Sequence, residues 1–302
     1  MAKLAPIILM AYKRPDQTRR VLESLAANPE ATDSELFVFA DGPKDSAAEE
    51  DLTQIEATRA IIRSHNWCGK VHIMERVGNY GLAKSVITAV TEVLEKHEQV
   101  IVLEDDLVVS PFFLQYMNAA LEMYKDEPQV ASIHGYVYPL KETLPATFFI
   151  RGADCWGWAT WSRAWKQFEP DGQKLYDTLR LKGEGSAFNF NNTYDFMKML
   201  RKQISGKNDS WAIRWNASTF LKNMVTLYPA QSLVQNIGAD ASGTHMDKAD
   251  APHFEVTLAT EPVRLQKLPV VASEQATAAF ADYFRSIKTG VFQKIVKTLK
   301  RK

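Results

Sequence analysis

The sequence VIVLEDD, residues 100–106, joins four apolar residues directly to three carboxylates. A short run of β-branched and aliphatic residues between polar neighbours is typical of a strand buried on both faces of a sheet. The acids Glu104, Asp105 and Asp106 would then stand at the carboxyl end of that strand, where open α/β sheets keep their ligand crevices. This stretch therefore predicts an α/β fold with an acidic ligand site.

Three adjacent carboxylates are costly to keep ionised in a crevice. Two carboxylates about 4 Å apart repel each other by roughly 4 kcal/mol at an effective dielectric constant near 20. Mg²⁺ or Mn²⁺ would relieve this repulsion, because such ions accept one or two protein carboxylates and complete their coordination with waters and substrate phosphates. The acids thus predict a divalent metal site for a phosphorylated substrate, and the alternative is a solvated acidic turn.

Strand and helix signals alternate along the first 135 residues. The expected strands are 6–12, 36–40, 71–75, 100–103 and 130–134, and the expected helices are 15–26, 46–64, 81–97 and 111–124. The segment 81–97 places its apolar residues on one helical face. This order predicts a doubly wound α/β fold, in which helices flank a mostly parallel central sheet.

Polar residues follow the first three expected strands: Arg14, Asp41, Asn79 and Gly81. Since the carboxyl ends of parallel strands meet at one edge of the sheet, we expect these residues to converge on the acids. Arg14 could approach a phosphate, Asp41 could accept a hydrogen bond from a base or ribose, and Gly81 could admit a ligand at a helix start. The residues around Asp41 are also a good turn.

Composition limits the class of protein. The chain has 302 residues, of which 46% are hydrophobic and 24% charged, as expected for a soluble globular α/β protein. Lys plus Arg and Asp plus Glu both number 36, so no overall field favours nucleic acid as a partner. No apolar stretch approaches the ~20 residues of a membrane span. The chain has two cysteines, too few for a disulfide framework, and its first residues resemble a strand more than a signal peptide. Both features favour a cytoplasmic protein.

The carboxyl-terminal segment 285–302 differs in charge from the rest of the chain. It contains seven basic residues and no acidic one, which leaves the preceding residues with a formal charge of −7. Apolar residues recur in it at four-residue intervals: Ile287, Val291, Ile295 and Leu299. Such a basic amphipathic helix could lie on an anionic membrane, here at its inner face, or could dock on the domain as a terminal helix.

Four segments together resemble a known family: ILMAYKRP (8–15), FADGPKD (39–45), NYGLAK (79–84) and VIVLEDDLVVSPFFLQYM (100–117). They are similar to the nucleotide-sugar-binding half of GT-A glycosyltransferases, most closely the inverting type represented by N-acetylglucosaminyltransferase I. The resemblance implies that Asp106 is the direct metal ligand and that Glu104 and Asp105 contact the nucleotide sugar. It also implies that Asp41 reads a uracil ring, and hence that the donor is UDP-linked.

The segment CWGWATWSRAW (155–165) extends the resemblance into the second half of the chain. It is similar to the family's glycine-and-tryptophan segment, which forms the floor of the acceptor site. Trp156 and Trp158 flank Gly157, where a sugar ring could approach an indole face. We therefore expect one of these two tryptophans to contact the acceptor.

Two further segments carry the remaining candidate residues. NDSWAIRW (208–215) resembles an acid-then-tryptophan element in which the acid is the catalytic base, which implies Asp209. The family has an acid pair where this chain has Asp209 and Ser210, so the assignment requires a shift of one position, and Glu184 is a rival. YPAQSLVQNIGADASGTH (228–245) resembles the loop that closes over the donor, which implies that His245 lies near the metal and the pyrophosphate.

The resemblance divides the chain into a nucleotide-sugar-binding half (1–135), an acceptor-binding and catalytic half of the same GT-A domain (136–250) and an extension (251–302). It implies a metal-dependent inverting glycosyltransferase that moves a sugar to a glycan or lipid-linked acceptor in surface polysaccharide synthesis. One alternative is a sugar-phosphate nucleotidyltransferase, although the first loop lacks the glycine expected of that class. The other is a non-catalytic glycan-binding protein on the same fold.

Overall fold

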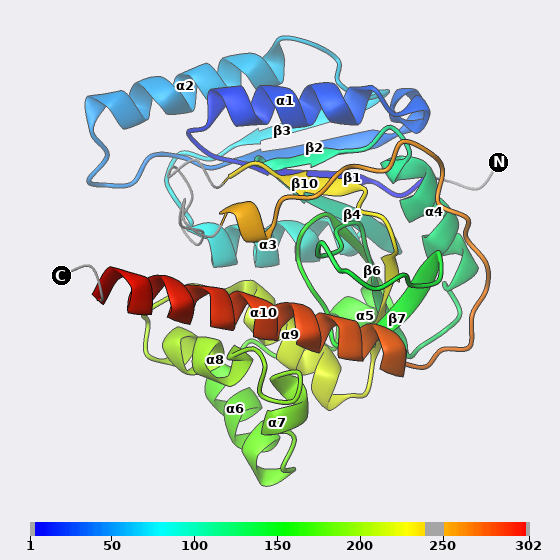
Figure 1. Ribbon diagram of the computed structural model, residues 1–302. Helices are drawn as coiled ribbons and strands as arrows, with labels where there is room; N and C mark the ends of the chain where they lie inside the picture. Colours follow the sequence, from blue (N-terminus) through cyan, green and yellow to red (C-terminus); the bar gives the residue numbers. More distant parts are fainter. Residues whose placement is uncertain (1–3, 239–250, 300–302) are drawn as a thin grey trace.

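The computed structural model describes residues 4–238 and 251–299 (Figure 1). Among these residues, one large sheet has eight strands in the order β3-β2-β1-β4-β8-β6-β9-β7. The strands are β1 (Ile7–Ala11), β2 (Glu35–Ala40), β3 (Lys70–Glu75), β4 (Gln99–Glu104), β6 (Val130–His134), β7 (Thr147–Arg151), β8 (Trp158–Trp161) and β9 (Val225–Pro229). Within this sheet, β7 and β8 are antiparallel to the other six strands, which are parallel to one another. The predicted α/β fold with a mostly parallel central sheet is confirmed.

The five strands predicted from the sequence are present as β1, β2, β3, β4 and β6, each within one residue of its expected limits. The apolar run of β4 is buried on both faces, as is the whole of β1. In β1, Ile7 and Leu9 face one core cluster, whereas Ile8 and Met10 face the other. A strand of this kind needs helices on both sides, because no face of it is left for water.

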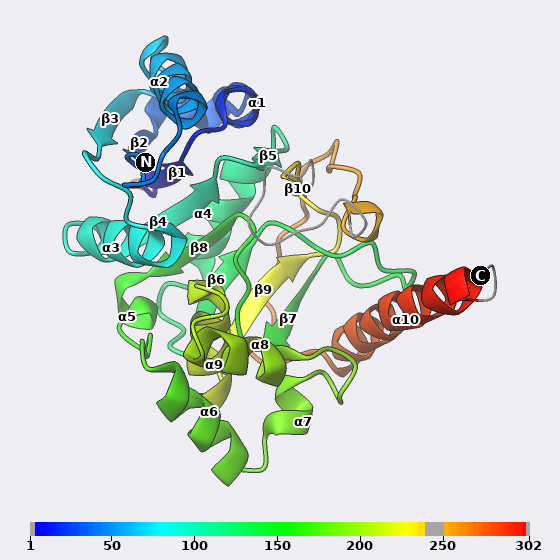
Figure 2. The same ribbon diagram turned by 90° about the vertical axis from the view of Figure 1, so that its left-hand side faces the viewer.

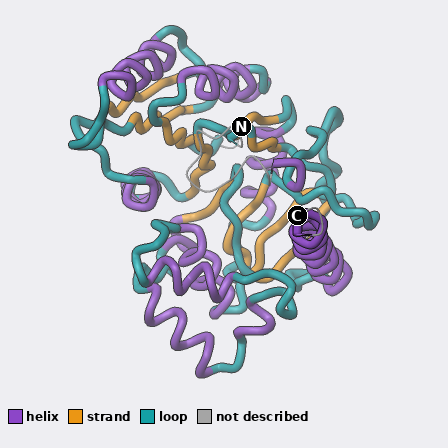
Figure 3. The backbone as a smooth tube through the Cα atoms, turned by 60° about the vertical axis from the view of Figure 1, so that its left-hand side comes forward, coloured by secondary structure: helices purple, strands orange, loops and turns teal. Residues whose placement is uncertain are grey.

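The helices of the first half supply this cover, as Figures 1 and 3 show. On one face lie α1 (Pro15–Ala26), α2 (Glu49–Arg63) and α4 (Phe113–Met123), and on the other lies α3 (Leu82–Leu94). The predicted helix 15–26 has the same bounds as α1. The other three are present but shorter than expected, by up to three residues at an end. A short 3-10 helix, η1 (Pro29–Asp33), leads into β2.

Helices of the second half lie below the sheet in the view of Figure 2. They are α5 (Ser162–Trp165), α6 (Gly172–Leu181), α7 (Gly185–Phe188), α8 (Phe196–Ile204) and α9 (Trp211–Leu221). The tryptophans of α9 join α3 in the core beneath the sheet, whereas its opposite face packs with α6, α7 and α8 in a cluster of its own. Strands from both predicted halves share the large sheet, since β8 lies between β4 and β6.

The extension after residue 250 packs on the domain. It begins with η2 (Ala251–His253), continues as an irregular segment that packs on the core cluster covered by α4, and ends in α10 (Glu274–Leu299). Phe280 and Phe284 of α10 are buried with Phe148 of the edge strand β7 and Tyr228 of its neighbour β9. The predicted terminal helix is therefore present, but it begins eleven residues before the expected start at 285, and its first half docks on the protein. No helix within 4–238 or 251–299 is long and apolar enough to cross a membrane.

Candidate functional site

Three carboxylates at the end of β4 form what we call the acidic cluster: Glu104, Asp105 and Asp106. Glu104 is the last residue of β4 and pairs with Met10 of β1. The backbone N–H of Tyr12, just past β1, donates to Asp105 Oδ2 at 2.9 Å. The cluster thus lies between β1 and β4, where the order of the parallel strands reverses. This is the position at which open α/β sheets bind their ligands.

Arg14 brings a positive charge to the acidic cluster. Its Nη1 lies 2.8 Å from Asp106 Oδ2 and 3.3 Å from Asp105 Oδ1. Its backbone is the N-cap of α1, so its C=O accepts the N–H of Thr18 at 2.9 Å. The start of α1 therefore fixes the backbone from which the guanidinium reaches the acids, as the sequence predicts for a residue that follows β1.

The acidic cluster crowds three carboxyl groups into a buried site with one guanidinium. Burial raises the pKa of the Glu104 and Asp105 carboxyls, the charge of Asp106 raises both further, and Arg14 opposes the shift. One guanidinium is therefore not enough to keep all three carboxyls ionised, and a divalent cation would favour their charged forms. Carboxylate oxygens are also the ligand type that Mg²⁺ and Mn²⁺ prefer. The cluster therefore fits a divalent cation.

Asp106 and the substrate would have to complete the coordination of such an ion. Within the described parts of the chain, no three His, Cys, Asp or Glu side chains are arranged as a ready metal site. A site that is completed by waters and phosphate oxygens does not require three protein ligands. His245, the second predicted ligand, lies outside the described residues.

Gly238 is a site residue that the sequence analysis missed. The strand β10 (Val234–Asn236) pairs with β5 (Leu107–Val109), and the N–H of Ile237 donates to the Asp106 backbone oxygen at 2.8 Å. This pairing carries Gly238 against the Asp106 side chain, where an added Cβ would overlap Oδ2. Only the absence of a side chain at position 238 leaves the carboxylate where it is. In the sequence, nothing about a glycine two residues after a short strand indicates that it will contact an acid of another strand.

Asp41, Asn79 and Gly81 join the loop after β2 to the loop before α3. The Asp41 carboxylate accepts the N–H of Tyr80, 3.0 Å from each oxygen, and the hydroxyl of Ser85 at 3.3 Å. The Asn79 side chain donates to the Gly42 oxygen at 3.0 Å and accepts the Gly81 N–H at 3.1 Å. These contacts set the spacing of the two loops, and the reading of a base by Asp41 stays a prediction.

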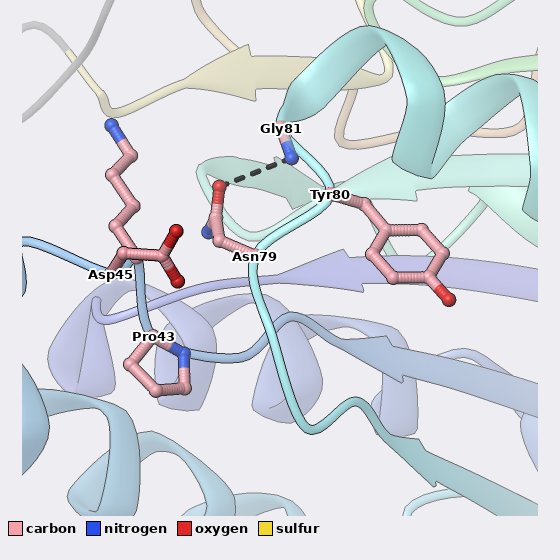
Figure 4. Close-up of a pocket in the computed structure, with 6 residues that line it drawn as sticks. Pro43, Asp45, Asn79, Tyr80 and Gly81 are labelled. Atoms are coloured by element: carbon pink, nitrogen blue, oxygen red, sulfur yellow. Dashed lines mark hydrogen bonds between the residues drawn. The ribbon is translucent and has the colours of Figure 1, made fainter.

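A hollow of about 310 Å³ opens between the same two loops (Figure 4). Its lining residues are Pro43, Lys44, Asp45, Asn79, Tyr80 and Gly81. The two loops follow β2 and β3, and β1 alone separates β2 from β4, so the hollow and the acidic cluster lie on the same rim of the sheet. An elongated ligand could therefore occupy the hollow at one end and the acidic cluster at the other.

Asp209 comes to this rim from the second half of the chain. Its Oδ2 accepts the N–H of Ala83, in the first turn of α3, at 3.4 Å and would lie 3.6 Å from a Cβ at Gly81. The neighbouring Ser210 is the N-cap of α9, and its hydroxyl accepts the N–H of Ile213 at 3.3 Å. Asp209 thus presents an exposed carboxylate beside Gly81, while Ser210 is used in capping.

Glu184, the rival base, lies at the opposite edge of the sheet. It pairs with the guanidinium of Arg151 at 3.0 and 3.1 Å. Arg151 ends the antiparallel strand β7 beside Val225, the first residue of β9, so it stands where the parallel strands begin. Four strand spacings, about 19 Å, also separate β7 from β4. The structure therefore keeps Glu184 apart from the acidic cluster.

The two candidate tryptophans differ in exposure. Trp158 has no exposed surface and packs against Trp165, Trp211 and Trp215, with ring centroids 5.2 to 6.1 Å apart. It points from β8 into the core, so it cannot meet an acceptor, and the prediction is corrected for this residue. Trp156 is half-buried, with its ring 4.8 Å from Tyr136 and 5.6 Å from Phe254.

Asp154 is a second residue near the site that the sequence analysis missed. Its carboxylate accepts the Tyr138 hydroxyl at 3.1 Å and the Cys155 N–H at 2.8 Å. Burial raises the pKa of the Cys155 thiol, and the charges of Asp154, Glu104 and Asp106 raise it further. The charges of Asp154 and of the acidic cluster therefore both act on Cys155. One partner of Asp154, Tyr138, lies in the loop after β6, and no local pattern predicts this contact.

A mostly parallel α/β sheet with an acidic cluster at the strand-order reversal and a hollow beside it defines a protein of the GT-A class. The model of the GNT-I family matches residues 1–184, which is more than half of the chain, and the chain belongs to this family. The resemblance read from the sequence is confirmed. The matched residues include the acidic cluster, Arg14 and Asp154, whereas Asp209 lies beyond them.

Comparisons with individual proteins found one related sequence and more distant solved structures. An alpha-1,3-mannosyl-glycoprotein 2-beta-N-acetylglucosaminyltransferase of Arabidopsis thaliana is 27% identical over 193 residues, which are 59% of this chain and 43% of that protein. The match therefore spans less than half of that relative. Among solved structures, S. aureus TarS 1-349 aligns with a TM-score of 0.40 and 11% sequence identity. The alignment covers 78% of this chain and 61% of the TarS chain. A UDP-glucose pyrophosphorylase complexed with UDP-glucose aligns with a TM-score of 0.37 and 12% sequence identity. The alignment covers 75% of this chain and 90% of the pyrophosphorylase chain.

Proposed function

We propose that this protein is a metal-dependent inverting glycosyltransferase that moves a sugar from a nucleoside diphosphate donor, UDP-linked, to a glycan or lipid-linked acceptor. The observation that carries the proposal is the crowding of three carboxyl groups around one guanidinium at the end of β4, at the point where the strand order reverses. Membership of the GNT-I family supports the reaction class. A role in surface polysaccharide synthesis is part of the same proposal.

The donor would lie along the rim of the sheet. Its nucleoside would occupy the hollow, with Asp41, Asn79 and Gly81 beside it, and its diphosphate would face the acidic cluster. Asp106, with His245, would hold Mn²⁺ or Mg²⁺, and Glu104 and Asp105 would contact the nucleotide sugar. When bound, the ion neutralises charge on the departing diphosphate. Arg14 would add a guanidinium to the same phosphates.

The acceptor would approach from the side of α9. Asp209 would take the proton of the attacking hydroxyl, because its exposed carboxylate is held beside Gly81 by the N–H of Ala83. Trp156 would offer its half-buried ring to the acceptor sugar. The configuration of the anomeric carbon would be inverted, because the acceptor oxygen would displace the diphosphate in one direct step that needs a single base.

A turnover assay tests the proposal. We expect the full chain to release UDP from UDP-sugars when Mn²⁺ is present, and to lose this activity in EDTA. Formation of pyrophosphate from a nucleoside triphosphate and a sugar phosphate would instead support the nucleotidyltransferase alternative. Binding of glycans without turnover of any nucleotide sugar would support the non-catalytic alternative.

Replacement of Asp209 by Asn should lower kcat by roughly 10²–10⁴-fold, the usual contribution of a general base. The KM for the donor should change little, because the side chain acts on the acceptor hydroxyl. Steady-state kinetics would check this, with Asp177→Asn, a change of an exposed acid on α6, as the control. Equal kcat values for the two variants would remove Asp209 from the mechanism.

We further propose that the protein is cytoplasmic and that residues 285–302 contact the inner face of an anionic membrane. The seven basic residues of this segment support the proposal, as does the continuation of α10 to Leu299. The full chain should sediment with phosphatidylserine vesicles at low salt and dissociate as salt rises. Sedimentation that is unchanged when Lys294 and Lys297 are replaced by Glu would contradict it.

A further inference from the structure

His134, the last residue of β6, is fully buried and joins the loop after β6 to the loop before β8. Its Nδ1 lies 2.7 Å from the backbone oxygen of Tyr136, and its Nε2 accepts the N–H of Trp156 at 3.1 Å. Because a carbonyl oxygen only accepts, Nδ1 carries the ring proton and Nε2 is left as the acceptor. Burial lowers the pKa of His134 by more than the charge of Asp154 raises it. The imidazole is therefore held neutral, in one tautomer.

The two residues that His134 joins also pack against each other. The rings of Tyr136 and Trp156 meet edge to face, with centroids 4.8 Å apart and planes at 75°. Phe254 of the extension adds a second contact, since its ring lies 5.6 Å from that of Trp156. Its backbone oxygen also accepts the hydroxyl of Tyr136 at 3.0 Å. The place of the Trp156 indole is thus set by the backbone bond to His134 and by two ring contacts.

Two glycines bound the loop between β7 and β8 that carries Trp156. Gly152 has a φ of 98° and Gly157 a φ of 63°, which residues with a Cβ rarely adopt. Near the start of the loop, the N–H of Ala153 donates to Asn216 Oδ1 of α9 at 3.2 Å. Near its end, the N–H of Trp156 is bonded to β6. The loop is therefore tied to α9 at one end and to the sheet at the other.

This loop lies beside the acidic cluster. The strands β4 and β8 pair at Val102 and Trp158. Two residues beyond that pair, toward the same end of the sheet, β4 carries Glu104 and the loop carries Trp156. Burial raises the pKa of the neighbouring Cys155 thiol, and the charges of the acidic cluster raise it further. A half-buried indole therefore stands next to the place where the proposed function puts the transferred sugar.

We propose that His134 is a positioning residue for the acceptor site: its Nε2 fixes Trp156 against Tyr136, so that the exposed part of the indole receives a sugar ring of the acceptor glycan. A side chain that is already ordered binds more tightly, because binding does not have to immobilise it. The inference rests on the proposed function, since it takes Trp156 as part of the acceptor site. It assigns an effect on acceptor affinity to a buried residue that does not touch the acceptor.

Two substitutions separate the two hydrogen bonds of His134. The side-chain oxygen in His134→Gln reaches the position of Nε2 and can accept the N–H of Trp156, whereas the shorter side chain in His134→Asn reaches only the position of Nδ1. Both variants remove the ring and its packing, so the difference between them reports the bond to Trp156. His65→Gln and His65→Asn, changes of an exposed histidine after α2, are the matched controls.

The full chain labelled with 5-fluorotryptophan reports on Trp156 by ¹⁹F NMR, and the loss of one signal in Trp156→Phe assigns it. Methyl glycosides of glucose, galactose, mannose and N-acetylglucosamine are titrated with and without UDP and Mn²⁺, and at least one should shift this signal. We expect the affinity for that glycoside to fall about tenfold in His134→Asn and by less than about threefold in His134→Gln. The two His65 variants should match the unaltered protein.

The outcomes separate this inference from the proposed function. Equal affinities in His134→Asn and His134→Gln, or a Trp156 signal that no glycoside moves, would overturn the inference, while release of UDP from UDP-sugars with Mn²⁺ would leave the proposed function standing. Glycoside binding at Trp156 without any such release would contradict the proposed function alone. If neither variant folds, the ring ¹⁵N shifts of the unaltered protein decide, because an Nε2–H tautomer or a charged His134 would overturn the inference.

Discussion

Replacement of Asp106 by Asn is expected to lower kcat/KM for sugar transfer by roughly 10³-fold or more, which corresponds to about 4 kcal/mol of transition-state stabilisation. Asn keeps the shape of the side chain and removes its charge, so Gly238 still fits against it while the metal loses its ligand. We expect this loss to be at least as large as that of Asp209→Asn, because uncompensated diphosphate charge costs more than a missing general base. Kinetics with a UDP-sugar and Mn²⁺ would check the ranking.

Two comparisons make the Asp106 result interpretable. Asp126→Asn, a change of an exposed acid after α4, should leave kcat/KM unchanged and shows the effect of losing a carboxylate elsewhere. The thermal stability of Asp106→Asn without metal should change little, because the variant removes a charge that repels Glu104 and Asp105 but also loses the ion pair with Arg14. Substantial transfer activity in a folded Asp106→Asn protein would refute its role as the metal ligand.

Replacement of Trp158 by Ala should lower the free energy of unfolding by about 3–5 kcal/mol, as for large aromatic residues in other cores. The side chain is fully buried among three other tryptophans and joins β8 to α5 and α9. Its indole N–H has no hydrogen-bond partner within the described residues, so the expected loss comes from packing alone. Unfolding in urea, with a check that the slope m is unchanged, measures it.

Trp156→Ala is the matched control for the core role of Trp158. Because Trp156 is half-buried, we expect a loss of stability below about 2 kcal/mol together with weaker binding of the acceptor. An equal loss of stability in the two variants would contradict the distinction drawn from their burial. Unaltered acceptor binding in Trp156→Ala would remove that residue from the acceptor site.

The sequence predicted the first half of the fold well because its signals are local. The run from Val100 to Leu103 is buried on both faces, and the bounds of α1 follow from Pro15 and the periodic apolar residues after it. The acidic cluster and Arg14 could be placed together for a related reason. Adjacent parallel strands end at the same edge, so residues that follow them meet.

The second half could not be predicted in this way. The strand β8 lies between β4 and β6 although it follows both in the chain, and only its tertiary position reveals that Trp158 faces the core. Gly238 reaches Asp106 through the pairing of β10 with β5, and Asp209 reaches Ala83 across 126 positions of sequence. Each contact depends on how distant segments pack, which periodicity and turn signals do not record.

Thermal unfolding of the full chain with UDP and Mn²⁺, separately and together, tests the central claim most directly. A ligand pair that binds the native state at about 100 times its Kd adds roughly 2.7 kcal/mol of stability, or about 5 °C or more in Tm. We predict such a shift for UDP with Mn²⁺, a much smaller one for either alone, and none for the pair in Asp106→Asn. A shift of the same size in Asp106→Asn, or no shift with any nucleoside diphosphate, would contradict the account.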